Sequence, residues 1–363
     1  MAPVWEVKQF YIRTSAPSGV SDSLYANGEM QVPLDVSIRA AKSGKTYKLT
    51  DDELNTIKIV YYNDTTKELG FGYSDGWYCM YDQNDYYHTL SSTSSSASAS
   101  LVQEAKYPDT PTPTITTTTT AADVTASASS DSDQAVQVKR FWVSTKKVEN
   151  ANFGASVLQP DKDKDGNITQ TKITTASTTF DSHVTLTGIG PIKYTTDNIT
   201  IATEDTASGT YQWDVDSDGK CHKEEKWTQK TWYISTKNHP LHKGSVWDVD
   251  VDHWGLFFAW DTGDGFSRNV GVEVSHMDGK HGTAKAWAGI KVNQKKGAVC
   301  LCRVNFDSPE GIWGSEWVFP SCHITLRDVY GNYGVIGASY SEDHDSVVVK
   351  NSEGNSEGRT WCS

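Results

Sequence analysis

Apolar and polar residues alternate along residues 30–39. One parity carries Met30, Val32, Leu34, Val36 and Ile38, and the other carries Gln31, Pro33, Asp35, Ser37 and Arg39. Because neighbouring side chains of a strand point to opposite faces, the pattern predicts an antiparallel strand with one buried face. Pro33 predicts an edge position, because proline donates no hydrogen bond to a ladder. The Asn27-Gly28 turn before the strand predicts a hairpin.

A second pattern occurs three times. It occupies residues 8–14, 139–145 and 230–236. Each copy consists of Lys, any residue, two aromatic residues, a β-branched aliphatic residue, Ser or Arg, and Thr. Aromatic and β-branched residues favour strands. The copies are separated by distances typical of domains, so we expect each copy to begin a β-domain. The alternative is a chance similarity between aromatic-rich strands.

Composition divides the chain further. Residues 91–134 are rich in Ser, Thr, Ala and Pro, and they cannot bury enough apolar area to offset chain entropy. They predict a linker or a long mobile insertion. We therefore expect an all-β protein with a β-sandwich domain at 1–90, the 91–134 linker, a Thr-rich β-domain at 135–226 and a Trp-rich β-sandwich domain at 227–363.

One short helix interrupts this all-β expectation. Thr50 with Glu53 matches a capping box, and Leu49 with Leu54 matches a hydrophobic staple. The two motifs together predict a single helical turn before the strand that starts near residue 57.

The Thr-rich domain contains an amphipathic segment around Gly188. Phe180, Val184 and Leu186 share one parity against hydroxyl-rich positions, and the pattern resumes at Ile199 and Ile201 beyond the turn at 188–191. This arrangement predicts a hairpin with one apolar face and one polar face.

The net charge of −13 limits the classes of partner. Nucleic acids and anionic membrane surfaces attract clustered Lys and Arg, so neither is expected as a partner. The sequence contains no run of 18 apolar residues, so no membrane-spanning helix is expected. The first residues do not match a secretory signal. We expect an extracellular protein, or one released without a visible signal peptide, with cytoplasmic accumulation as the alternative.

Six cysteines are spread along the chain without a Cys-x-x-Cys motif, so a zinc ribbon is not expected. Cys300 and Cys302 would share one face of a strand, too far apart to bond each other readily. We expect mostly free, buried thiols, with a disulfide at Cys322 or Cys362 as the alternative.

Two stretches resemble a known family. Residues 24–38, with the Ala26-Asn27-Gly28 turn and an alternating Val-rich strand, resemble the bacterial immunoglobulin-like repeats of invasin- and intimin-type surface proteins. Residues 322–332, a strand that ends in an Asp-x-x-Gly-Asn turn, resemble the second signature of those repeats. The resemblance implies two or three immunoglobulin-like β-sandwich domains joined by the Ser/Thr-rich linker. It also implies a non-catalytic spacer or adhesive role.

One segment has the spacing of a calcium-binding loop. Asp214, Asp216 and Asp218 are followed by Gly219 and by Glu225, which together could surround one cation with oxygen ligands. The favoured interpretation is a hairpin with a Ser-Asp-Gly turn, because residues 211–213 have the composition of a strand. Calcium binding is the alternative interpretation, and no other cofactor is expected.

The Trp-rich domain contains the candidate ligand-binding residues. Aromatic rings stack on the apolar face of a sugar while carboxylates accept its hydroxyl protons, so rings beside acids suit a carbohydrate site. The candidates are Trp247, Asp248, Asp250, Asp252, His253, Trp254 and Trp260. The favoured alternative places these Trp rings in the core and the Asp row in solvent.

The sequence carries none of the common catalytic motifs. The chain contains no His-Glu-x-x-His, no Gly-x-Ser-x-Gly, no phosphate-binding glycine loop and no dinucleotide fingerprint, so we do not expect an enzyme.

Three functions remain open from the sequence. The first is an adhesion- or lectin-like protein, a virulence or host-interaction factor, that binds a glycan or a host-cell surface protein. The second is a β-pore-forming toxin that inserts the hairpin around Gly188 into a membrane. The third is a self-assembling structural protein, a homo-oligomer, in which sandwiches add strands edge to edge.

Overall fold

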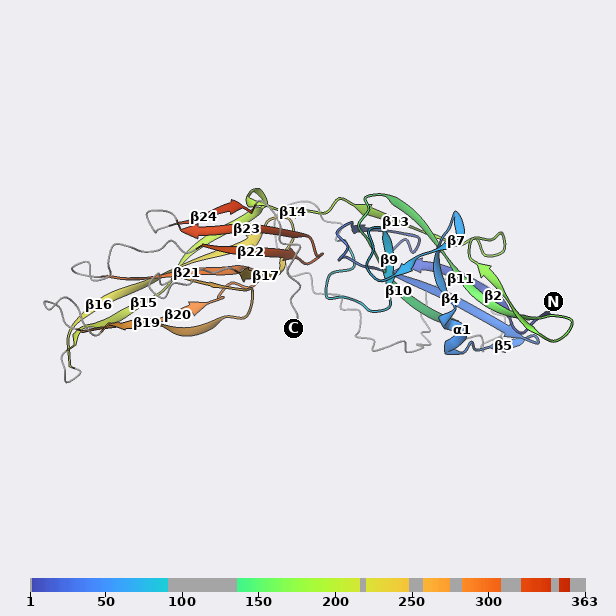
Figure 1. The fold of residues 1–363 in the computed structure, drawn as a ribbon, viewed down its shortest axis with the longest axis horizontal. Helices are drawn as coiled ribbons and strands as arrows, with labels where there is room; N and C mark the ends of the chain where they lie inside the picture. The colour runs from blue at the N-terminus through green and yellow to red at the C-terminus, as the bar shows by residue number, and fades with distance from the viewer. Residues whose placement is uncertain are drawn as a thin grey trace. The chain divides into compact units, whose positions relative to one another are not determined.

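The chain forms two compact units, residues 1–191 and residues 192–363, in a computed structural model (Figure 1). The structure describes residues 2–90, 136–215, 220–247, 257–274, 283–307, 321–340 and 346–352. Among these residues, strands dominate both units and form two sheets in each. The predicted all-β sandwich class is confirmed.

The first unit contains one sheet of seven described strands and one of six. The first has the order β3-β13-β11-β6-β7, with β1 and β12 also paired to β11. Its strands are β1 (Ala2–Pro3), β3 (Ser21–Tyr25), β6 (Lys58–Tyr61), β7 (Asp64–Glu68), β11 (Asn150–Lys162), β12 (Ile168–Thr174) and β13 (Val184–Ile189). The second has the order β2-β4-β10-β9-β8, with β5 paired to β4. Its strands are β2 (Glu6–Thr14), β4 (Val32–Lys42), β5 (Lys45–Tyr47), β8 (Gly70–Phe71), β9 (Trp77–Met80) and β10 (Gln137–Thr145).

Both sheets of the first unit contribute to its core. Residues of β13 are buried alternately, whereas β4, β10 and β11 each contain runs of consecutive buried residues. The side chains that solvent does not reach include Leu34, Val36, Ile38, Phe141, Phe153, Val184 and Leu186. Burial of this apolar area is the main favourable contribution to folding of the unit.

The second unit contains one sheet of five described strands and one of six. The first has the order β14-β23-β22-β17, with β24 paired to β23. Its strands are β14 (Lys193–Tyr194), β17 (Leu241–Trp247), β22 (Ser321–Asp328), β23 (Tyr333–Tyr340) and β24 (Val347–Asn351). The second has the order β18-β21-β16-β15-β20-β19. Its strands are β15 (Ile199–Val215), β16 (Cys221–Thr236), β18 (Phe257–Trp260), β19 (Phe266–Val274), β20 (Thr283–Val292) and β21 (Val299–Phe306). In Figure 1, β22, β23 and β24 form one layer of this unit, and β15, β16, β19 and β20 form another.

The six-stranded sheet of the second unit buries residues on both of its faces. On β16 and β21, Trp232 and Leu301 face a cluster shared with β22 and β23. Their neighbours Tyr233 and Cys302 face a second cluster, which residues of β19 and β20 complete. Because successive side chains alternate between faces, two central strands can belong to two cores at once.

The predicted helical turn is confirmed as α1 (Asp51–Asn55), with both hydrogen bonds of the capping box present. Glu53 also accepts a hydrogen bond from Trp5 Nε1 at 2.6 Å, which ties the helix to the chain just before β2. A second short helix, the 3₁₀ turn η1 (Thr196–Asn198), precedes β15.

The three copies of the seven-residue aromatic pattern all lie in strands, as predicted, but the second and third copies do not begin domains. The copy at 139–145 lies in β10, which pairs with β4, and β4 pairs on its other side with the first copy in β2. The third copy is the end of β16, which follows β15 in the same sheet. Aromatic and β-branched residues favour strands anywhere in a fold, so their recurrence marked strands rather than boundaries.

The predicted domain boundaries therefore change. The predicted 135–226 domain does not form one unit, because residues 136–191 complete the sheets of the first unit and residues 192–226 belong to the second. The boundary at 226/227 falls inside β16. The 91–134 segment lies outside the described residues. Two units remain within the predicted range of two or three sandwich domains.

Three predictions about β4 are wrong. Its predicted polar face is partly buried, since Pro33 and Ser37 are buried as well as the apolar parity. This strand lies between β2 and β10 rather than at an edge. Pro33 is tolerated because the ladder with β2 ends at Leu34, so the missing N–H does not interrupt that ladder. The Asn27-Gly28 turn joins β3 to β4, which belong to different sheets, so it is a crossover and not a hairpin. Gly28 supplies the positive φ of 77° that this turn requires.

The predicted hairpin around Gly188 is also wrong. Gly188 lies inside β13, which pairs with β3 and β11 of the first unit. The next long strand, β15, pairs with β16 in the second unit. Val184 and Leu186 are fully buried in the first unit's core. This part of the chain therefore does not form the membrane-inserting hairpin that was predicted. The Ser/Thr-rich residues 91–134, the other feature that favoured a pore-forming toxin, lie outside the described residues.

The cysteine prediction is confirmed for four of the six residues. Cys79, Cys300, Cys302 and Cys322 are free and buried. Burial raises the pKa of the Cys79 and Cys322 thiols to about 12 and that of Cys300 to about 11. These thiols are therefore protonated and poorly nucleophilic at neutral pH.

The Asp-x-x-Gly-Asn turn joins β22 to β23 and is fully buried. Asp328 Oδ1 accepts hydrogen bonds from the backbone N–H groups of Tyr330 at 2.8 Å and Asn332 at 2.9 Å. Asp328 Oδ2 accepts from Tyr194 Oη at 2.8 Å and from Asn332 Nδ2 at 2.9 Å. Asn332 Oδ1 in turn accepts from the N–H of Ile192 at 3.1 Å. This turn therefore holds the first residues of the second unit, including β14.

Candidate functional site

Two of the seven predicted ligand-binding residues lie in described parts of the chain. Trp247 ends β17 and Trp260 ends β18. Asp248, Asp250, Asp252, His253 and Trp254 lie outside the described residues. The structure places the two Trp residues on different sheets of the second unit.

Trp247 lies half-buried on the outer face of the five-stranded sheet. Its ring stacks on His323 of β22, with centroids 4.5 Å apart, and its Nε1 donates to Thr325 Oγ1 at 3.0 Å. The adjacent Val246 packs against the core, so alternation turns the Trp247 ring away from it. The indole N–H is satisfied within the protein, which leaves this ring with a structural role on its sheet.

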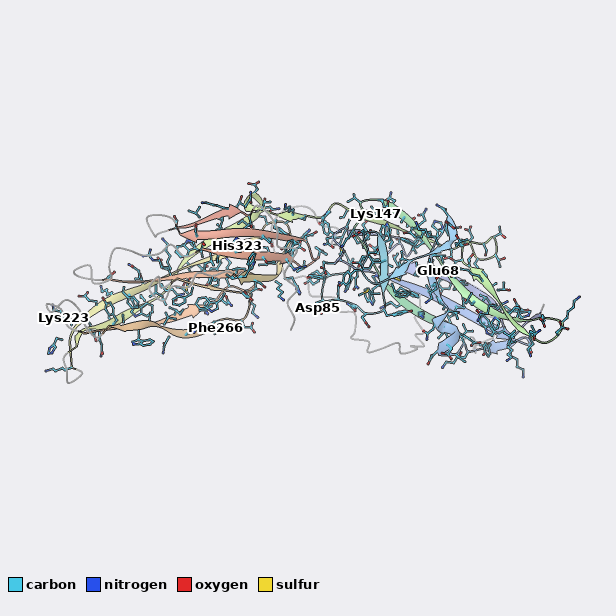
Figure 2. All side chains as sticks on the ribbon, in the orientation of Figure 1. Glu68, Asp85, Lys147, Lys223, Phe266 and His323 are labelled. Atoms are coloured by element: carbon cyan, nitrogen blue, oxygen red, sulfur yellow. The ribbon has the colours of Figure 1, made fainter. Side chains whose placement is uncertain are left out.

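Trp260 belongs to a row of three aromatic rings, which we call the Trp260 edge: Phe258, Trp260 and Phe266. The rings of Phe258 and Trp260 are stacked, with centroids 5.5 Å apart, and the Phe266 ring meets Trp260 edge-on at 6.1 Å. Phe258 and Trp260 are partly buried against the core, whereas Phe266 is 40% exposed. Figure 2 shows Phe266 and His323 in different layers of the unit.

The Trp260 edge forms where the two outermost strands of the six-stranded sheet approach each other. β18 and β19 lie at opposite ends of the strand order, yet only residues 261–265 separate them in the chain. This connection carries two exposed carboxylates, Asp261 and Asp264. Asp261 Oδ1 accepts from the N–H of Val246 at 2.6 Å, and Thr262 N–H donates to Gly244 O at 2.9 Å. The loop is therefore fixed to β17, and its two acids lie on the connection between the strands that carry the rings.

A buried polar residue supports the same loop. Asn293 is 5% exposed, and its Nδ2 donates to Asp261 O at 3.0 Å. Added Cβ atoms at Gly263 and Gly265 would lie 3.3 Å from Asn293 Nδ2 and 2.9 Å from Gln294 Nε2, respectively. The glycines thus let the loop lie close to the β20–β21 connection.

Two residues of the predicted calcium loop are described: Asp214 lies on β15 and Glu225 on β16. The register pairs Glu225 with Tyr211, three residues before Asp214 along β15. At about 3.4 Å per residue, this pairing separates Glu225 from Asp214 by roughly 10 Å along the strands. Asp216 and Asp218 lie outside the described residues. Across the described ranges, no three His, Cys, Asp or Glu side chains gather in a way that could hold a metal ion.

Sequence reasoning missed one exposed indole. Trp287 on β20 is 51% exposed. The signal was present in the alternation of residues 284–292, in which Ala286, Ala288, Ile290 and Val292 take the buried parity. Trp287 falls on the other parity, which predicts an exposed ring. It pairs with Gly271 across the ladder, so no side chain of that partner covers it.

Comparison with known proteins leaves the family open. No protein-family model matches the chain, and no curated protein matches it. Among solved structures, the C-terminal domain of the AgI/II polypeptide BspA from Streptococcus agalactiae aligns with 94% of this chain and 100% of its own length. The identity is 9% and the TM-score is 0.21, a value too low to carry an argument. In the described parts of the chain, no helix has the length and apolar character needed to cross a membrane.

Proposed function

We propose that this protein is a non-enzymatic, adhesion-type binding protein and that its second unit contacts a glycan through the Trp260 edge. The observation that carries the proposal is the row of three contacting rings at the end of β18, flanked by the exposed carboxylates of Asp261 and Asp264. Such a row offers an apolar surface to the face of a pyranose ring, while the acids accept hydrogen bonds from its hydroxyl groups.

The construction of the edge supports a binding role. The rings of Phe258 and Trp260 are anchored against the core on one side, so little side-chain entropy is lost when a ligand covers their other side. The loop between the strands is fixed by hydrogen bonds to β17 and to Asn293. A ligand would therefore meet a surface that already has its bound geometry.

Replacing Phe266 by alanine is expected to weaken glycan binding by roughly 10-fold or more, because an aromatic residue at the centre of a contact commonly contributes over 1 kcal/mol. Trp260→Ala should have a larger effect. The measurement is binding of the full-length chain to a glycan array, followed by titration calorimetry with the best glycan. Thermal unfolding of each variant, followed by circular dichroism, separates lost binding from lost folding.

The matched control is Trp287→Ala, which removes an exposed indole from another part of the same sheet. It should leave binding unchanged. If no glycan binds, or if Trp287→Ala weakens binding while Phe266→Ala does not, the Trp260 edge is not the site.

Several predictions from the sequence accompany this proposal. Calcium bound by Asp214, Asp216, Asp218 and Glu225, a host-cell surface protein as partner, an extracellular location and self-assembly into homo-oligomers all stay predictions. Light scattering at increasing concentration, with and without calcium, measures the last of these directly.

A further inference from the structure

A second aromatic surface lies in the first unit, beyond the end of β9, and it contains two lysines. The rings of Phe71, Tyr81 and Phe141 contact one another, with centroid distances of 4.5 Å for Phe71–Tyr81, 5.9 Å for Tyr81–Phe141 and 6.2 Å for Phe71–Phe141. Phe141 is fully buried and forms the base. Phe71 and Tyr81 lie over it and are 42% and 51% exposed.

Lys58 and Lys139 flank these rings. Lys58 Nζ lies 5.2 Å from the centroid of Phe71, and Lys139 Nζ lies 5.2 Å from that of Tyr81 and 5.5 Å from that of Phe141. Lys139 Nζ also donates to Leu54 O and to Asn55 Oδ1, both at 3.1 Å, at the end of α1. The two lysines belong to different sheets, since Lys58 is on β6 and Lys139 is on β10.

Neither ammonium group has an acidic partner in the described part of the chain. The strand next to β6, β7, carries two carboxylates. Asp64 accepts a hydrogen bond from the Thr66 hydroxyl at 2.6 Å, and Glu68, labelled in Figure 2, pairs with Lys172 at 3.1 Å. The two lysines are close enough for the charge of Lys58 to affect the pKa of Lys139. Two half-buried like charges that act on each other are unfavourable when no acidic side chain pairs with them. An anion from outside would remove this repulsion.

We propose that Lys58, Lys139, Phe71 and Tyr81 form a binding site for a carboxylate-bearing saccharide. The ammonium groups would pair with carboxylates, and the exposed rings would stack on the apolar face of a pyranose. An anion without a flat apolar face would use only half of this surface. A neutral sugar would leave the two charges uncompensated.

This site is independent of the proposed function. It lies in the first unit, it uses none of the residues of the Trp260 edge, and it selects its ligand by charge. A protein with both sites would bind two kinds of saccharide through two units.

The test is titration calorimetry of the full-length chain with tetragalacturonate and with its fully methyl-esterified form, which keeps the rings and removes the charges. The unsubstituted chain should bind the acid and not the ester, and added salt should weaken binding. Lys58→Gln and Lys139→Gln should each reduce affinity by about 10-fold or more, because hydrogen bonds to charged groups are strong. Phe71→Ser should also reduce it, and Lys58→Arg should retain binding.

Lys67→Gln is the matched control. Lys67 lies on the neighbouring β7, and its Nζ is 4.5 Å from the centroid of the Tyr61 ring. The Lys67→Gln variant therefore removes one positive charge that also lies over an aromatic ring, but outside the proposed site. The proposal is overturned if tetragalacturonate does not bind, if the ester binds equally well, or if Lys58→Gln binds as tightly as Lys67→Gln. Acid binding that is lost in Phe266→Ala and kept in Lys58→Gln would support the Trp260 edge and overturn this site.

The pH dependence gives a second readout. Burial, and then the neighbouring ammonium of Lys58, lower the pKa of Lys139 to about 8. The charged form binds the anion, so affinity should be complete below pH 8 and should fall as the pH rises through 8. Around the site, burial raises the pKa of Tyr81, and burial raises that of Cys79 to about 12, so both stay protonated in this range. Lys139→Gln should abolish the pH dependence.

Discussion

Replacing Asp328 by alanine is expected to destabilise the second unit by about 3–5 kcal/mol. The carboxylate is fully buried and accepts hydrogen bonds from four groups: two backbone N–H groups, the hydroxyl of Tyr194 and the side-chain amide of Asn332. Removing it leaves these donors buried without an acceptor, which costs more than the hydrogen bonds themselves contributed. Domains are typically stable by about 5–15 kcal/mol, so the variant should be close to unfolding at 37 °C.

The measurement is urea unfolding followed by tryptophan fluorescence, because most of the 13 Trp residues lie in the second unit. Asp264→Ala is the control, since that carboxylate is almost fully exposed and its ion pair with Lys296 is exposed too. It should change stability by no more than about 0.5 kcal/mol. Equal urea midpoints for the two variants would contradict the role given to the buried turn.

Replacing Gly188 by alanine is expected to destabilise the first unit by about 3 kcal/mol. A Cβ atom at this position would lie 2.1 Å from the backbone oxygen of Lys147 and 3.1 Å from Thr145 Cγ2. A backbone oxygen cannot rotate away as a flexible side chain can, so β13 or the end of β10 must move. The shift would also strain the hydrogen bond from Gly188 N–H to Glu149 O.

Hydrogen exchange read by mass spectrometry checks this prediction unit by unit. Peptides from β3, β11 and β13 should exchange faster in Gly188→Ala, and those from the second unit should not change. Gly190→Ala is the matched control two residues away, because a Cβ atom there would meet nothing within 4 Å. Protection in Gly188→Ala equal to that in Gly190→Ala would show that β10 and β13 pack more loosely than the structure indicates.

Local patterns predicted individual elements well. Most of residues 30–39, where apolar and polar residues alternate, lie in β4, and the three copies of the aromatic pattern lie in strands. Thr50 and Glu53 form the predicted capping box. Each of these features depends on residues a few positions apart, whose geometry is set by side-chain direction and short-range hydrogen bonds.

The errors concern partners distant in sequence. Pro33 suggested an edge, yet β4 has neighbours on both sides, and one of them arrives about a hundred residues later in the chain. The turn at Asn27-Gly28 and the segment around Gly188 both looked like hairpins because turn residues bend the chain in the same way at a crossover and at a hairpin. Alternation defines which face of a strand is buried but not which strand lies beside it.

The candidate sites show the same division. Trp260 was predicted as a ligand-binding residue from the Trp- and Asp-rich composition around it. Its contact with Phe266, however, depends on the approach of two strands at opposite ends of a sheet. Trp287 could have been found from parity alone. Lys58 and Lys139 could not, because they lie in different sheets and only the packing of those sheets brings their charges together.

The sequence by itself determined that this protein is built of strands, where one short helix begins and which residues of many strands are buried. The tertiary structure alone decided that the strands form two units, that Tyr194 meets a carboxylate 134 residues away and that two lysines share one aromatic surface. The physical reason is that strand pairing and sheet packing are non-local. Their free energy comes from burying whole faces together, and many registers of the same local pattern compete until the complete chain has folded.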